Sequence, residues 1–123
     1  MRPFWYAGSM AKHNQIDLIE FPVKSGKQLK QTKDFFRQVF GWKYTDWGGD
    51  YSDTEASGTN SGVNADGGAT MPLTVIYSAD LEKTKQLVVQ NGGKIIVDTY
   101  TFPGGRRFHF TEPSGNELAV WSE

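Results

Sequence analysis

The sequence predicts an α+β fold built from two successive βαβββ units in one domain. Two segments that alternate like strands begin roughly 55 residues apart, which suggests a duplicated unit. Each is followed by a segment with helical periodicity that stops at glycine, and then by further strand-like segments. A chain of 123 residues is long enough for one such domain and too short for two independent ones.

The first unit begins with a strand over residues 16–23, whose apolar content indicates burial on at least one face. A helix follows over residues 28–40 and ends at Gly41, since glycine tolerates the positive φ found after helices. The predicted apolar face of this helix consists of Leu29, Phe35, Phe36, Val39 and Phe40. Further strands are expected over residues 42–47, 51–56 and 61–64.

The second unit repeats this order from a strand over residues 71–78. Asp80 is expected to cap a helix that ends at the Asn91-Gly92-Gly93 sequence. The apolar face of that helix uses Leu81, Thr84, Leu87 and Val88. The remaining strands are predicted over residues 94–101, 106–111 and 117–121, with a tight turn over residues 113–116.

Composition excludes several classes of protein. The formal net charge is −1 with both signs interspersed, so no basic surface for nucleic acid or anionic membrane is expected. No apolar run approaches the roughly 20 residues that span a bilayer. The absence of cysteine rules out disulfides, thiolate metal ligands and a cysteine nucleophile. Residues 1–14 are predicted as a flexible N-terminal extension of a domain over residues 15–123, and a cytoplasmic location is expected.

Three segments carry a resemblance to a known family: IEFPV at 19–23, FFRQVFGW at 35–42 and FPGGRRFHFTEPSGNELAVW at 102–121. In order and spacing they resemble the vicinal-oxygen-chelate superfamily of glyoxalase and bleomycin-resistance proteins, in particular the group related to lactoylglutathione lyase. The resemblance implies a U-shaped antiparallel cup formed by two βαβββ modules, at about 15–68 and 71–122. It also implies a homodimer, but it does not fix a reaction.

In metal-dependent members of this family, ligands project into the cup from the first strand of each module and from the last strands. Counting from fixed points places Leu18, Leu73 and Ala119 at three of these positions, and the fourth lies within residues 48–68. Leucine and alanine have no donor atom for a metal ion. We therefore expect no cofactor, with a divalent metal as the alternative if the register is misread.

Strand geometry predicts which side chains share the cup face with these positions. On the three strands they are Leu18, Glu20 and Pro22; Leu73, Val75 and Tyr77; and Glu117, Ala119 and Trp121. Arg107 or His109 on the neighbouring strand could join them. The predicted ligand-binding face is therefore apolar and aromatic, with a few polar groups.

Glu20 and His109 are the candidate catalytic residues. A carboxylate such as Glu20 among apolar neighbours suits a general acid or base, although it could instead pair with Arg107 or reach water. His109 can carry protons near neutral pH, but a lone histidine on a strand is more often structural.

Three kinds of function stay open at this stage. The chain could bind a small apolar or aromatic molecule without a metal, which the missing ligands favour. It could be a lyase or isomerase acting on a small oxygenated metabolite, using Glu20, His109 or a metal. It could also be a degenerate scaffold for protein association.

Overall fold

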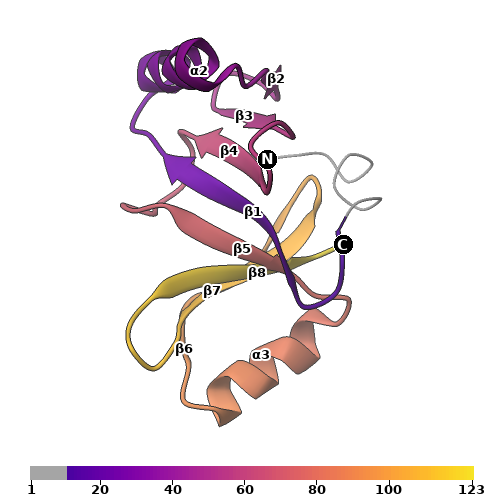
Figure 1. Cartoon of the computed structure of the whole chain (residues 1–123). Helices are drawn as coiled ribbons and strands as arrows, with labels where there is room; N and C mark the ends of the chain where they lie inside the picture. The colour runs from indigo at the N-terminus through magenta and orange to yellow at the C-terminus, as the bar shows by residue number, and fades with distance from the viewer. Residues whose placement is uncertain (1–10) are drawn as a thin grey trace. The chain divides into compact units, whose positions relative to one another are not determined.

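A computed structural model of the chain describes residues 11–123, which form two compact units. The first unit is Leu18–Leu73, and the second combines residues 11–17 with Thr74–Glu123. Each unit has one strand, one helix and three further strands in that order (Figure 1). This order confirms the predicted α+β fold of two βαβββ units. Residues 1–10 of the predicted N-terminal extension lie outside the described residues.

The first unit contains a four-stranded sheet with the order β2-β3-β4-β1. β4 runs parallel to β1 and antiparallel to β3. Its elements are β1 (Gln15–Pro22), α2 (Gly26–Phe40), β2 (Thr45–Asp46), β3 (Tyr51–Thr54) and β4 (Asn60–Asn64). Because β1 starts at Gln15, its first three residues belong to the second unit and the rest to the first.

The strand predicted over residues 42–47 is wrong in length, since β2 has only two residues. The ring of Trp42 packs 5.1 Å from that of Phe36 and 5.2 Å from that of Phe40, measured between centroids. These contacts hold Trp42 against the end of α2, so only Thr45 and Asp46 pair with β3. An alternating sequence pattern does not distinguish these two outcomes.

Helix α2 begins and ends at residues suited to those positions. The Ser25 hydroxyl accepts a hydrogen bond from the Gln28 backbone N–H, and Gly41 ends the helix with φ 74°. The predicted apolar face is only partly buried: Leu29 is buried and Phe36 half-buried, whereas Phe35, Val39 and Phe40 are each more than half exposed. The stripe is wider than the sheet surface that the helix covers.

The second unit contains a sheet with the order β5-β8-β7-β6. β5 pairs in parallel with β8, and β7 pairs in antiparallel fashion with both β8 and β6. The elements are β5 (Leu73–Tyr77), α3 (Leu81–Gln90), β6 (Lys94–Phe102), β7 (Gly105–Thr111) and β8 (Glu117–Ser122). Asp80 caps α3 as predicted, by accepting a hydrogen bond from the Lys83 backbone N–H.

The core of the second unit lies between α3 and one face of its sheet. Its buried cluster is formed by Leu81, Phe108, Phe110 and Val120, with Val88, Ile95 and Leu118 packed against it. Leu87, which was predicted on the apolar face of α3, is instead 48 % exposed. The helix therefore uses a narrower stripe than its sequence pattern suggests.

No helix among residues 11–123 combines the length and the apolar character needed to cross a membrane.

Replacing a core phenylalanine should cost far more stability than replacing an exposed one. Phe108 is fully buried, and Phe108→Ala is expected to lower the free energy of unfolding by about 3–5 kcal/mol. Phe35→Ala, at a residue 58 % exposed, is expected to change it by less than about 1 kcal/mol. Urea denaturation of both variants measures the difference, and equal losses would contradict this assignment of the core.

Candidate functional site

In the first unit, two buried carboxylates lie on the sheet face that α2 does not cover. Phe21 points toward the helix, where its ring packs 5.4 Å from that of Phe36. Glu20 therefore points to the opposite face, because neighbouring residues of a strand alternate. Glu20 pairs with Gly62 of β4, and Gly62 pairs with Asp53 of β3, which places Asp53 on the same face. Both acidic side chains are at least 96 % buried.

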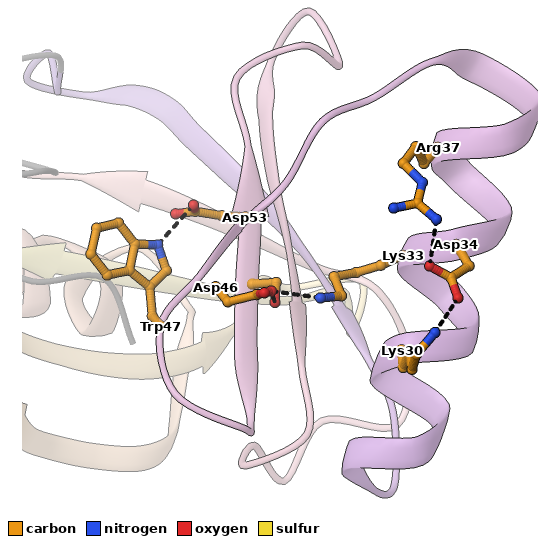
Figure 2. Close-up of polar contacts among 8 residues, drawn as sticks. Lys30, Lys33, Asp34, Arg37, Asp46, Trp47 and Asp53 are labelled. Atoms are coloured by element: carbon orange, nitrogen blue, oxygen red, sulfur yellow. Dashed lines mark hydrogen bonds and ion pairs between the residues drawn. The ribbon is translucent and has the colours of Figure 1, made fainter.

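Each of these carboxylates accepts a hydrogen bond from an aromatic side chain. The Tyr51 hydroxyl donates to Oε2 of Glu20 at 3.2 Å. The indole N–H of Trp47 donates to Oδ1 of Asp53 at 2.9 Å, as Figure 2 shows. Burial of a carboxylate is costly unless such donors accompany it. These bonds therefore compensate part of that cost on an otherwise water-poor face.

A second polar group ties β2 to α2 (Figure 2). Lys33 of the helix forms an ion pair with Asp46 at 2.5 Å, and the Ser52 hydroxyl donates to the same carboxylate oxygen. The hydrogen bond from Lys33, and next that from Ser52, lowers the pKa of Asp46 below its usual value. Asp46 is exposed while Ser52 is buried, so this group fastens a two-residue edge strand to the helix.

In the second unit, the sheet face opposite α3 carries most of the residues expected to bind a ligand. Strand pairing aligns Val75 with Ala119 and Ala119 with His109; it also aligns Tyr77 with Trp121, and Trp121 with Arg107. Paired residues of neighbouring strands share a face. Phe108 and Phe110 point the other way into the α3 core. The face thus combines an apolar centre with a basic side.

His109 lies at the centre of a polar group on this face. The Arg107 Nε–H donates to His109 Nε2 at 3.2 Å, and the Tyr100 hydroxyl lies 2.8 Å from the same nitrogen. A guanidinium cannot accept a hydrogen bond, so Nε2 carries no proton in this arrangement. The proton is then on Nδ1, which faces the Glu117 carboxylate at 3.5 Å. A substrate that transfers a proton to Nε2 of His109 would therefore have to displace the hydrogen bonds from Arg107 and Tyr100.

Aromatic rings form the other side of the same face. Tyr77 and Trp121 meet edge to face with centroids 4.9 Å apart, and Phe102 lies 6.2 Å from Trp121. The indole N–H of Trp121 donates to Asp17 at 3.0 Å, and the Tyr77 hydroxyl donates to Glu123. The hydrogen bond to Glu123, followed by burial, raises the pKa of Tyr77 to about 12.

The structure divides the predicted site residues between the two units. Leu18 and Glu20 lie in the first unit, both buried, and Leu73 is the buried first residue of β5. The second unit brings together the remaining predicted residues on one face: Tyr77, Arg107, His109, Glu117, Ala119 and Trp121. Of these, Glu117 is the most exposed.

Several polar residues of these faces were not predicted from the sequence. They are Asp17, Trp47, Tyr51, Asp53 and Tyr100. The alternation of residues 51–56 places Tyr51 and Asp53 on one strand face, and this signal could have drawn attention to them. Their partners depend on strand pairing, which the sequence pattern does not reveal.

The three residues that the sequence register assigns to metal-ligand positions offer no ligand for a metal ion. Leu18, Leu73 and Ala119 offer no nitrogen or oxygen donor from their side chains. Over residues 11–123, no group of three histidine, cysteine, aspartate or glutamate side chains lies close enough to share an ion. Glu20 and Asp53 each accept a hydrogen bond from an aromatic side chain.

Two consecutive βαβββ units, each with one helix on one face of its sheet, define a class of α+β proteins built by duplication. The chain belongs to the Glyoxalase/Bleomycin resistance protein/Dioxygenase superfamily, whose sequence profile matches residues 15–120. This match confirms the resemblance found in the sequence. No curated protein sequence matches the chain significantly.

Solved structures with the same fold share little sequence with this chain. One, described as an NAD-dependent benzaldehyde dehydrogenase from Legionella pneumophila, has a TM-score of 0.71 at 12 % identity, covering 85 % of this chain and 96 % of its own. A hypothetical protein from Bacillus halodurans C-125 has a TM-score of 0.68 at 15 % identity, with coverages of 91 % and 96 %. A glyoxalase/bleomycin resistance protein/dioxygenase superfamily member from Vibrio splendidus 12B01 has a TM-score of 0.63 at 11 % identity, with coverages of 86 % and 97 %. At such identities the likeness shows the fold alone.

The buried hydroxyl of Tyr44 should make the protein sensitive to alkaline pH. Burial raises the pKa of Tyr44 to about 12, from a value near 10 for an unfolded tyrosine. The folded state therefore holds its proton more tightly, and the free energy of unfolding should fall as pH rises from about 10 to 12. Urea denaturation across this range should show a smaller fall in Tyr44→Phe.

Urea denaturation of Tyr44→Phe at neutral pH serves as the control. The Tyr44 hydroxyl has no hydrogen-bond partner among the described residues, so its removal should leave stability unchanged or slightly higher. An identical alkaline fall in wild type and variant would contradict the assignment.

Proposed function

We propose that this protein binds a small apolar or aromatic molecule, without a metal ion, on the sheet face of the second unit opposite α3. The composition of that face supports the proposal most strongly. Tyr77, Trp121 and Ala119 supply apolar and aromatic surface, and Arg107 and His109 supply a few polar groups beside it. Ligand sites in proteins combine these two features, with the polar groups fixing the ligand's orientation.

Membership in the family supports small-molecule binding as the general role but leaves the reaction open. Metal independence is supported by the register drawn from the sequence, which assigns leucine and alanine to the positions of metal-donating residues. Glu20, on a buried face of the first unit, belongs to the second candidate function. Homodimer formation and a cytoplasmic location stay predictions.

The second candidate is a lyase or isomerase that uses Glu20 as acid or base. Its support is a carboxylate that is 96 % buried and accepts a hydrogen bond from a hydroxyl, the geometry that a general acid or base requires. His109 is less suited, because Arg107 and Tyr100 already share its unprotonated nitrogen. Glu20→Gln should abolish an activity of this kind, whereas unchanged turnover would exclude Glu20 from the mechanism.

Metal content is the first quantity to measure. Elemental mass spectrometry on protein purified without chelator or metal-affinity resin should find no transition metal in stoichiometric amount. A stoichiometric metal would mean that the alignment of Leu18, Leu73 and Ala119 with the ligand positions is wrong. The proposal would then give way to a metal-dependent enzyme.

Binding of the neutral aromatic dye N-phenyl-1-naphthylamine tests the proposed face directly. Its fluorescence should rise in a saturable, one-site manner, and Tyr77→Ala should weaken binding about tenfold by removing one aromatic wall. Phe35→Ala is the matched control, because Phe35 is an exposed aromatic residue of α2. Loss of binding in Phe35→Ala with no change in Tyr77→Ala would place the dye on the helix and contradict the proposal.

A further inference from the structure

Gly62 occupies a position where a glycine needs an explanation. It lies in the middle of β4, paired with both neighbouring strands, and strand interiors disfavour glycine. Its φ lies outside the left-handed region, so the backbone conformation there is open to any residue. The reason must therefore be a close approach by another group.

That group is the side chain of Tyr51. A Cβ atom at Gly62 would lie 2.5 Å from the Tyr51 hydroxyl oxygen and 2.9 Å from Cζ, closer than real Cβ atoms come to a neighbour. The phenol ring thus passes directly over Gly62. Any larger residue at this position would push the end of the ring away.

The path of the Tyr51 side chain leads across the sheet to Glu20. Tyr51 is on β3, Gly62 is on the middle strand β4, and Glu20 is the residue of β1 that pairs with Gly62. Two strand spacings, about 10 Å, separate β3 from β1. The Tyr51 side chain crosses β4 and the Glu20 side chain closes the rest of this span, so that the hydroxyl lies 3.2 Å from Oε2 of Glu20. Both side chains are buried, at 1 % and 4 % exposed.

We infer that Tyr51 is a positioning residue for the Glu20 carboxylate, and that Gly62 is the position that makes this possible. A tyrosine has only two side-chain torsions, and packing over β4 fixes them, so its hydroxyl is a fixed donor. A glutamate has three side-chain torsions, and a hydrogen bond from a fixed donor restricts them. The functional meaning of this inference rests on the second candidate function, in which Glu20 acts as acid or base.

The orientation of Glu20 can be followed by infrared spectroscopy of protein labelled with ¹³C-glutamate. The difference between wild type and Glu20→Gln identifies the carboxylate band of Glu20. Tyr51→Phe keeps the ring and removes only the hydroxyl, and it should shift this band because one hydrogen bond is lost. Gly62→Ala should shift it in the same direction, and the double variant should add little, since both changes remove the same contact.

Gly68→Ala is the matched control, because a Cβ at Gly68 meets no atom within 4 Å and its backbone conformation is not left-handed. It should leave the band in place. If Gly62→Ala does not fold, Tyr51→Phe alone still decides the question. An unshifted band in Tyr51→Phe would mean that Tyr51 only fills space, and would overturn the inference.

Dye binding separates this inference from the proposed function. A shifted band in a protein whose wild type binds no dye would uphold the positioning role and overturn the proposed function. A shifted band together with unchanged turnover in Glu20→Gln would uphold the positioning role and overturn the functional part of the inference.

Discussion

The structure depends on one constraint: each sheet has two faces, and a single helix covers only one of them. In the second unit, Phe108 and Phe110 point into the core under α3, and the pleat of the strand sends Arg107 and His109 to the other face. The same alternation in β1 directs Phe21 toward α2 and Glu20 away from it. The helix side therefore provides apolar packing, and polar side chains with potential chemistry are confined to the opposite face.

Placing carboxylates on such faces requires donors, and aromatic side chains provide them in both units. Tyr51 donates to Glu20, Trp47 to Asp53 and Trp121 to Asp17. A phenol or an indole supplies one polar hydrogen on a large apolar body, so it satisfies a carboxylate without bringing in a second buried charge. These hydrogen bonds hold an acidic side chain in place within the sheet.

Sequence periodicity predicted the order of elements well because strand alternation and helix stripes are local properties. It predicted the cap at Asp80 and the stop at Gly41 for the same reason. It misjudged β2 and the exposure of Phe35, since both depend on what lies opposite a residue in space. The hydrogen-bond partners of Glu20 and His109 could not be predicted either. Strand pairing brings together residues that are far apart in the sequence, such as Glu20 and Tyr51, which are 31 positions apart.

The shared strand β1 makes the two units unequal in how they can be synthesised and folded. Among residues 11–123 the first unit is one continuous stretch of chain, and all its strands have been synthesised once Asn64 has been added. The second unit draws on both ends: the hydrogen bond from Trp121 to Asp17 joins residues 104 positions apart, and the Asn14 backbone N–H donates to Tyr77. Such contacts close long loops and form late. A fragment that starts at Thr74 therefore lacks part of its own unit, whereas a fragment that ends at Leu73 keeps the whole of the first.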